Sequence, residues 1–404
     1  MMPVHPVHER GRLDPVRIEA VQLQILESEP VATEWRPLRR MQEYPGSTKV
    51  RFTHRPYEGP GIKLSPRPAY AAYLRLQTSE NLETIGLFAV SWGREHLEWE
   101  ARVFKAQWES ELAGQNALGR EYIWHKMWMA RRYFHMPSTT PLALIDELLW
   151  DLAGLRAGLP VHKLLGGFRD RVPAYLTETG VPFDECLKAA ERARTEKFLG
   201  FKDHSILGVK QNIELAHEIR RVVGEDFALM HDPVQQYTVE DAIQVGRELE
   251  RLGYLWMEEP LQEHDIAGLK RLCDALDLPI LVLESLPGAP YSPVPYVVAG
   301  AGDILRQTGL GITGQVKLAN LAETFGMNCH GGNPHVVAAI RNDDWWEVAA
   351  WPPTGPDRSL RTAFAGLVRD THRVDNGYMY VPQTPGLGRA IDWQGICDRT
   401  VAVI

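Results

Sequence analysis

The amino-acid sequence predicts an α/β protein, in which a (β/α)-barrel follows a smaller α+β unit. Three observations support this prediction. The chain has 404 residues, whereas a barrel takes roughly 250, which leaves room for one further domain. Residues 21–25 and 72–76 alternate apolar and polar side chains, as strands with one wet face do. From Val172 onward, short apolar runs alternate with amphipathic segments, which is the pattern of βα units and a parallel sheet.

The N-terminal part reads as strands, then a loop, then helices. A polar turn at residues 78–81 joins the strand at 72–76 to a second strand at 85–90, which predicts a hairpin. Residues 44–68 are rich in Gly, Pro, Arg and His, a composition typical of a long loop that can carry binding residues. Residues 95–136 are charged and helical in pattern. Pro141 then occupies the first turn of a further helix.

Eight short apolar runs follow at the spacing of barrel strands. They are residues 174–177, 201–207, 227–231, 254–257, 280–283, 304–305, 327–329 and 345–348. Thr238 and Asp241 stand in capping-box positions for the helix after the third run, which ends at Gly253. At least one unit therefore has both helix ends marked.

Three acids stand directly after the third, fourth and fifth of these runs. They are Asp232, Glu258 and Glu284, each separated from the next by 26 residues. Successive parallel strands are neighbours in a barrel, so their C-terminal ends bring the three carboxylates to one patch of the rim. Adjacent ionised carboxylates repel one another unless a cation lies among them. Oxygen-only ligands favour Mg²⁺, although each acid alone could be an ordinary solvated loop residue.

Composition and charge limit the possible partners. The chain is 44% hydrophobic and 24% charged, with a formal net charge of -8. No block of like charge predicts a nucleic-acid or membrane partner. No secretory signal or membrane span is recognised, so we expect a cytoplasmic protein. The four cysteines, Cys186, Cys273, Cys329 and Cys397, have no paired spacing and are expected to be reduced thiols.

Several segments resemble the enolase superfamily, in its mandelate racemase and muconate lactonizing enzyme branch. They are IDELLWDLAG at 145–154, LPVHKLLGG at 159–167, WMEEP at 256–260 and PGLG at 385–388. The resemblance implies an α+β capping domain at 1–140, a modified TIM barrel at 141–384 and a C-terminal segment at 385–404 that returns to the cap. It also implies a homo-oligomer, and it assigns Mg²⁺ to Asp232, Glu258 and Glu284. The chemistry shared by this family is removal of the proton α to a carboxylate.

The sequence departs from the family at the usual bases. Alignment on Gly200 and Phe201 puts Ser205 and Leu207 where many members carry two lysines on the second strand. Alternation then puts Lys202 and His204 on the opposite face of that strand. There they contact either the substrate or the surrounding helices, and His204 is one of the predicted substrate-binding residues.

The resemblance implies a catalytic role for His330, which follows the seventh strand. A histidine can serve as a base and then as an acid near neutral pH. The family usually backs this histidine with an Asp after the sixth strand, but Thr308 falls nearest to that place here. Glu347 on the eighth strand is expected to touch the substrate near the metal. His54, in the 44–68 loop, is expected to contact the distal end of the substrate.

These features favour one function over two others. A racemase needs a competent group on each face of the α-carbon, and the absent lysine pair removes one. β-Elimination of water needs one base, and the resemblance to the family's aldonate and aldarate dehydratases then implies a Mg²⁺-dependent dehydratase acting on a sugar-acid carboxylate. The alternatives are a degenerate member that binds Mg²⁺ and a carboxylate without turnover, and a racemase or epimerase.

Overall fold

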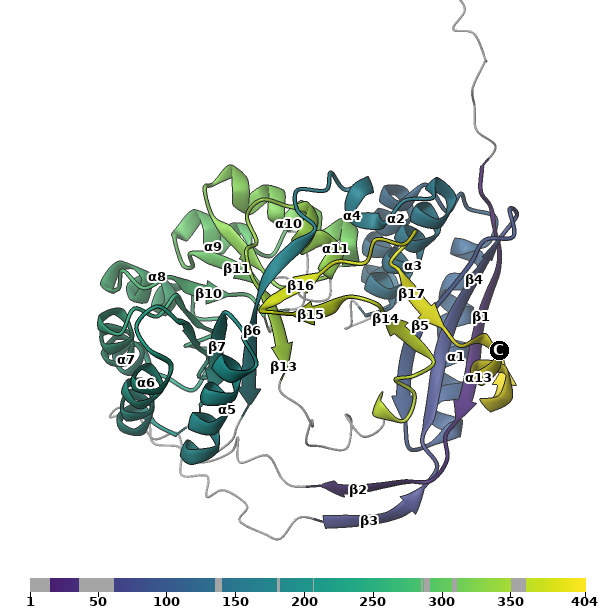
Figure 1. Cartoon of the computed structure of the whole chain (residues 1–404). Helices are drawn as coiled ribbons and strands as arrows, with labels where there is room; N and C mark the ends of the chain where they lie inside the picture. The colour runs from purple at the N-terminus through teal and green to yellow at the C-terminus, as the bar shows by residue number, and fades with distance from the viewer. Residues whose placement is uncertain are drawn as a thin grey trace, which may run out of the picture.

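The computed structural model describes most of the chain. The described residues are 15–35, 62–134, 140–179, 182–205, 207–284, 286, 291–306, 311–349 and 361–404. Figure 1 shows a barrel formed by the middle of the chain, beside a sheet formed by its N-terminal part and its last strand. Among the described residues, no helix has both the length and the apolar character that a bilayer crossing requires.

The N-terminal sheet and its helices form a unit that we call the cap. Its antiparallel sheet has the order β18–β1–β4–β5. These strands are β18 (Thr400–Val403), β1 (Ile18–Glu27), β4 (Tyr70–Thr78) and β5 (Glu83–Ser91), and helices α1 (Arg94–Leu112) and α2 (Arg120–Phe134) follow. Helix α3 (Thr140–Ala157), which the predicted boundary assigns to the barrel, buries Ile145 and Leu148 in the same core. The predicted domain boundaries stay predictions.

The eight predicted barrel strands are present and parallel. They are β6 (Arg171–Thr179), β7 (Gly200–His204), β8 (Ala228–His231), β9 (Trp256–Glu258), β10 (Ile280–Val282), β11 (Ile304–Arg306), β12 (Asn328–His330) and β13 (Trp346–Ala349). The ladder runs from β12 through consecutive strands to β6, which also pairs with β13. The predicted α/β barrel fold is confirmed.

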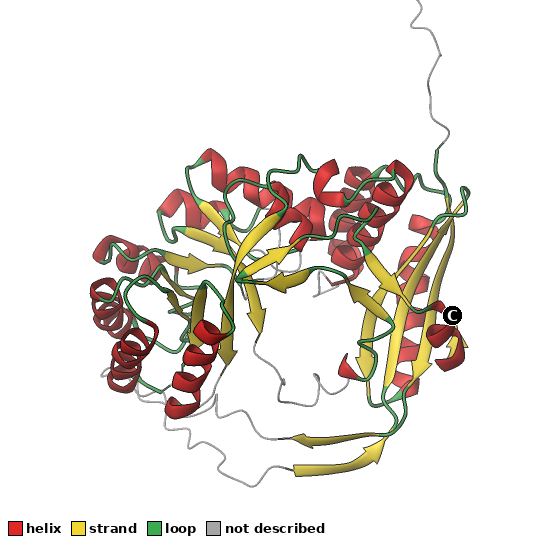
Figure 2. Ribbon diagram, in the orientation of Figure 1, coloured by secondary structure: helices red, strands yellow, loops and turns green. Residues whose placement is uncertain are grey.

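Helices cover the outside of this barrel, as Figure 2 shows in red around the yellow strands. They are α5 (Phe183–Thr195), α6 (Val209–Val223), α7 (Val239–Arg251), α8 (Ile266–Ala275), α9 (Val294–Ala299), α10 (Gly311–Thr324) and α11 (Pro334–Ala339). Helix α7 starts with the predicted capping box, because Thr238 accepts from the Asp241 amide and Asp241 accepts from the Thr238 amide. Apolar side chains of strands and helices form one large outer core.

Short elements connect the two units. Helix α4 (Val161–Leu164) precedes the barrel, and β2 (Val31–Trp35) pairs with β3 (Ile62–Arg67). After β13, β15 (Arg373–Asp375) and β16 (Tyr378–Tyr380) extend the sheet at the start of β6, while β14 (Val368–Asp370) pairs with β17 (Arg389–Ile391). Helix α13 (Trp393–Arg399) then leads into β18.

The barrel interior contains a second, smaller core. Tyr175, Met230, Trp256 and Leu281 form this inner layer and are buried. The layer fills the barrel below the strand ends, so the barrel is a packed core rather than a pore.

Candidate active site

The three predicted acids lie together at the C-terminal ends of β8, β9 and β10. One carboxylate oxygen from each of Asp232, Glu258 and Glu284 lies within 4.8 Å of the others. Asp232 and Glu258 are buried, and Glu284 is half-buried. Their strands are adjacent in the ladder, so residues at equivalent strand ends converge as the equal spacing predicted.

Two buried cations accompany these acids. The Lys202 ammonium lies 2.7 Å from Glu258 Oε2, 3.1 Å from Glu347 Oε1 and 3.6 Å from Asp232 Oδ2. The Arg306 guanidinium lies 2.8 Å from Glu258 Oε1, 3.1 Å from Glu284 Oε2 and 2.7 Å from Glu347 Oε2. Glu347, which was predicted to approach the substrate, thus lies on β13 within the same cluster.

Burial and charge act in opposite directions on these groups. Burial raises the pKa of Glu258, but Arg306 and Lys202 outweigh it and hold the pKa at about 2. Burial lowers the pKa of Lys202, but Glu258 and Glu347 raise it well above its usual value. Lys202 therefore stays protonated and acts as a fixed positive charge. Glu284 differs, because burial and the nearby Glu258 charge raise its pKa to about 8 although Arg306 opposes them.

The cluster has the charge and donor set that suit a divalent cation. Four carboxylates face two permanent cations, so two negative charges remain when every acid is ionised. Glu258 Oε1 is buried and has no hydrogen-bond partner among the described residues, although Arg306 Nη1 lies near it. An unsatisfied buried oxygen between two further carboxylates offers the oxygen-only coordination that Mg²⁺ prefers.

The predicted orientation of β7 was wrong. Phe201 is buried in the outer core, and alternation from it turns Lys202 and His204 toward the barrel interior. His204 Nε2 lies 2.7 Å from Asp232 Oδ2, and its Nδ1 lies 2.8 Å from Thr177 Oγ1. The apolar side chain of Phe201 carried the correct signal, because a barrel strand turns such residues toward its helices.

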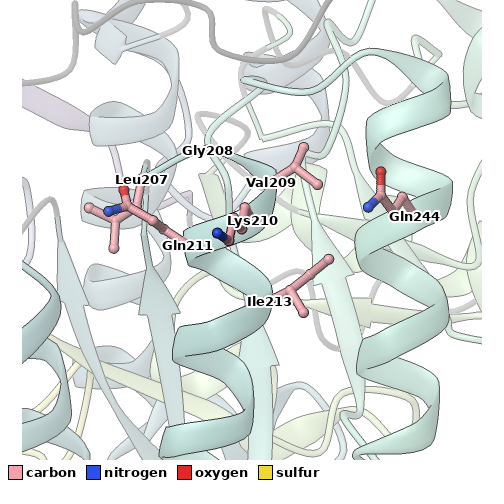
Figure 3. Close-up of a pocket in the computed structure, with 7 residues that line it drawn as sticks. All are labelled: Leu207, Gly208, Val209, Lys210, Gln211, Ile213 and Gln244. Carbon is pink, nitrogen blue, oxygen red and sulfur yellow. The ribbon is translucent and has the colours of Figure 1, made fainter.

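Ser205 and Leu207 do not occupy catalytic positions. Strand β7 ends at His204, so both residues lie beyond it. Ser205 bonds to the outward-facing Asp203. Leu207 lines a pocket at the start of α6, together with residues such as Val209 and Gln244 (Figure 3). The seven residues that line this pocket include no carboxylate, so it is no rival to the acid cluster as a metal site.

His330 ends β12 and is buried between two polar partners. Its Nε2 lies 2.8 Å from the Tyr175 hydroxyl, and its Nδ1 lies 3.4 Å from Asp343 Oδ1. Burial raises the pKa of Asp343, and its hydrogen bond with His330 opposes the rise. The expectation that His330 lacks a carboxylate partner was therefore wrong. Thr308 and His54 lie outside the described residues.

Four residues of the site were not assigned to it from the sequence. Arg306 ends the sixth strand, so the rule that identified the acids could also have identified it. Tyr175 and Lys202 could be assigned to the site only if the inward-facing side of their strands had been known. Asp343 lies between α11 and the start of β13 rather than at the C-terminal end of a strand, and no spacing pointed to it.

Known proteins resemble this chain in sequence and structure. A family model described as enolase C-terminal domain-like matches residues 185–395. Arabinonate dehydratase from Saccharolobus solfataricus is 32% identical over 295 residues, which are 67% of this chain and 75% of that protein. L-talarate/galactarate dehydratase from Salmonella typhimurium is 31% identical over 269 residues, which are 62% of this chain and 63% of that protein. The crystal structure of D-glucarate dehydratase from Agrobacterium tumefaciens complexed with magnesium is 28% identical, with a TM-score of 0.78 over 96% of this chain and 100% of that chain.

Proposed function

Because this chain belongs to the enolase superfamily, in its mandelate racemase and muconate lactonizing enzyme branch, we propose that it is a Mg²⁺-dependent dehydratase of acid sugars. It removes the proton α to the substrate carboxylate and eliminates water from the β-carbon. The observation that carries this proposal is the convergence of three carboxylates at a barrel mouth that also holds His204 and His330. The relatives named as sugar-acid dehydratases support it.

Asp232, Glu258 and Glu284 are the residues that would hold the Mg²⁺. The similar D-glucarate dehydratase was crystallised with magnesium, which supports this choice of ion. Bound Mg²⁺ supplies Lewis-acid stabilisation of the negative charge that develops on the substrate carboxylate. Lys202, which stays protonated, adds a positive charge beside Glu258 and Asp232.

The reaction also needs two proton transfers, one from the α-carbon and one to the departing hydroxyl. His204 on β7 and His330 on β12 come from strands that are not neighbours in the ladder. One imidazole takes the α-proton, and an imidazolium gives a proton to the hydroxyl that leaves as water. The enol product then tautomerises: C3 takes up a proton, the enol hydroxyl at C2 releases one, and a 2-keto-3-deoxy acid results.

Two arguments drawn from the sequence about other functions have lost their basis. The sequence disfavoured a racemase because the second strand had no inward base, but His204 occupies that face. A degenerate binder was suggested by the missing lysine pair and the missing carboxylate partner of His330, and Asp343 now provides that partner. The choice of dehydratase therefore depends on the named relatives. A homo-oligomeric state and a cytoplasmic location stay predictions.

A substrate screen tests the proposed reaction. The protein is incubated with excess Mg²⁺ and each of a panel of aldonic and aldaric acids, and 2-keto-3-deoxy product is detected as its semicarbazone. We expect product from at least one acid, none after chelation by EDTA, and none from Glu258→Gln. Acids that raise the melting temperature without giving product would support the degenerate binder. Deuterium exchange at the α-carbon with inversion and no elimination would support the racemase.

A further inference from the structure

The turn that follows Asp232 has a backbone conformation that its residues disfavour. Val234 has a φ of 51° and Gln235 a φ of 60°. A β-branched residue at positive φ is a steric outlier, and such outliers persist only where the surroundings enforce them. This turn must therefore be held by contacts outside itself.

The same turn determines where the Asp232 carboxylate points. The Val234 amide donates to Asp232 Oδ1 at 2.9 Å, while His204 Nε2 lies 2.7 Å from Asp232 Oδ2. Each oxygen thus has its own partner, one from the turn and one from β7. If Val234 relaxed to negative φ, its amide would turn away and release Oδ1.

Tyr237 anchors the far end of the turn. Its amide donates to the Pro260 carbonyl at 3.1 Å. Its hydroxyl lies 2.5 Å from Asn212 Nδ2, which donates to it, and 2.9 Å from His231 Nε2. Tyr237 is only 6% exposed, so these polar contacts are made without competition from water.

Further hydrogen bonds link Tyr237, through His231, to the outer face of β7 and β8. His231 Nδ1 lies 2.8 Å from Asp203 Oδ1, and these two residues are paired across β7 and β8. The Asp232 amide donates to the Asp203 carbonyl at 2.8 Å. Asp203, His231 and Tyr237 form a buried network on the outer face of the strands whose inner face holds Lys202 and His204. We call it the Asp203–His231–Tyr237 network.

We propose that Tyr237 is a positioning residue, which through this network holds the Val234–Gln235 turn in its left-handed conformation and so fixes Asp232 for metal binding. The inference rests on the proposed function, in that it takes Asp232 to be a ligand of Mg²⁺. Residues that orient metal ligands typically change metal affinity by 10- to 100-fold when they are removed.

Mg²⁺ titration by calorimetry, performed on the full chain well below its melting temperature, tests this role. Tyr237→Phe should raise the Kd for Mg²⁺ about tenfold or more. Tyr254→Phe is the matched control, because Tyr254 is also buried in the outer core and its hydroxyl donates to the Ala216 carbonyl at 3.5 Å, away from the Asp203–His231–Tyr237 network. It should leave the Kd unchanged.

A second substitution separates positioning from general destabilisation. Asn adopts positive φ more readily than Val, so Val234→Asn lowers the cost of the native turn. Added to Tyr237→Phe, it should restore most of the lost Mg²⁺ affinity. An unchanged Kd in Tyr237→Phe, an equal change in Tyr254→Phe, or no rescue by Val234→Asn would each overturn the inference.

Asp232→Asn distinguishes failure of the inference from failure of the proposed function. If Asp232→Asn leaves the Kd for Mg²⁺ unchanged, the metal site itself is misassigned. If Asp232→Asn weakens binding and Tyr237→Phe does not, only the positioning role fails.

Discussion

The tautomer of His330 is determined by the two groups that flank its ring. Burial, with a contribution from Glu347, raises the pKa of Tyr175 well above 10, so its phenol keeps its proton. That hydroxyl can donate to His330 Nε2 at 2.8 Å, which leaves the proton of the neutral ring on Nδ1, facing Asp343. To exchange a proton with substrate, Nε2 must exchange its Tyr175 contact for a substrate contact. Tyr175 is therefore the group with which the substrate competes for His330.

Removal of the imidazole should stop the reaction without emptying the metal site. We expect His330→Asn to lower kcat by about 10²- to 10⁴-fold, the usual contribution of a positioned acid or base. The Kd for Mg²⁺ should stay within about threefold, because the ring nitrogens of His330 face Tyr175 and Asp343, neither of which belongs to the predicted metal ligands. Steady-state kinetics measures the change in kcat, and calorimetry measures the Kd for Mg²⁺. Full activity in this variant would exclude His330 as a proton carrier.

Asp343 should matter for catalysis, although it was not predicted as a site residue. Asp343→Asn removes the carboxylate that orients His330, and we expect a 10- to 100-fold loss of kcat. Asp344→Asn is a matched control, because Asp344 is exposed and pairs with Arg169 at 2.9 Å. Similar activities in the two variants would contradict a role for Asp343.

Residues of the site could be predicted from the sequence only where their place at the end of a strand determined the direction of the side chain. Asp232, Glu258 and Glu284 stand at strand ends, so their spacing alone brought them together. Lys202 was assigned to the wrong face because the alignment extended the strand beyond His204. Asp343 lies in the loop before β13 and reaches His330 through the folding of that loop, and no periodic pattern encodes such a contact.

At the scale of elements, α7 offers a direct test of local sequence signals. Thr238→Ala removes both hydrogen bonds that the Thr238 hydroxyl makes with Asp241, and we expect a loss of about 1 kcal/mol in the free energy of unfolding. Thr324→Ala is the control, since the Thr324 hydroxyl bonds only to the carbonyl of Asn320 within its own helix. Urea unfolding measures both. A loss no larger than in the control would contradict the importance of the cap.

Helix α3 carries a buried acid whose ionisation should be visible in stability. Burial raises the pKa of Asp146 from 3.8 to about 7, although the Thr313 amide donates to it at 2.7 Å. The folded protein keeps this proton up to about pH 7, whereas the unfolded chain loses it near pH 4. Its contribution to stability is therefore full below pH 4 and is lost as the pH rises toward 7, by up to about 4 kcal/mol.

Asp146→Asn removes that titration. Between pH 4 and pH 7 the free energy of unfolding of the variant should fall less than that of the wild type, because asparagine has no proton to lose. The other groups titrate in both proteins and do not affect this difference. Urea unfolding at a series of pH values gives the two slopes. Parallel curves would show that Asp146 ionises at the same pH in the folded and unfolded chains.

The elements themselves were largely predictable. All eight barrel strands and the hairpin of β4 and β5 appear where apolar runs and turn residues placed them, because these patterns depend on neighbours in the sequence. The pairing of β16 with β6 joins residues far apart in the chain. Short strands of three residues carry no periodicity of their own, so this extension of the sheet was not predicted.

At the scale of the whole molecule, one short strand completes the cap. β18 pairs with β1, and the backbone groups of Leu23 and Ile404 exchange two hydrogen bonds of 3.0 and 2.9 Å. Val401 and Ile404 pack against the cap core. The cap is therefore stabilised by residues that follow the entire barrel in sequence.

Deletion of residues 400–404 should weaken the cap and spare the metal site. We expect the melting temperature to fall by roughly 5–10 °C, the equivalent of a few kcal/mol in a chain of this size. The Kd for Mg²⁺ should not change, because all three carboxylates are on the barrel. Scanning fluorimetry and calorimetry measure these effects. Loss of Mg²⁺ binding at a temperature where the truncated chain is folded would show that the two units are coupled.

The place of β18 in the sheet also has a consequence for biosynthesis. Translation delivers β1, β4 and β5 early, whereas the strand that pairs with the outer edge of β1 leaves the ribosome after every barrel strand. Throughout that interval the nascent chain presents an open strand edge, to which another extended peptide can add. The emerging polypeptide therefore depends on rapid elongation, or on a chaperone, until β18 has left the ribosome and paired with β1.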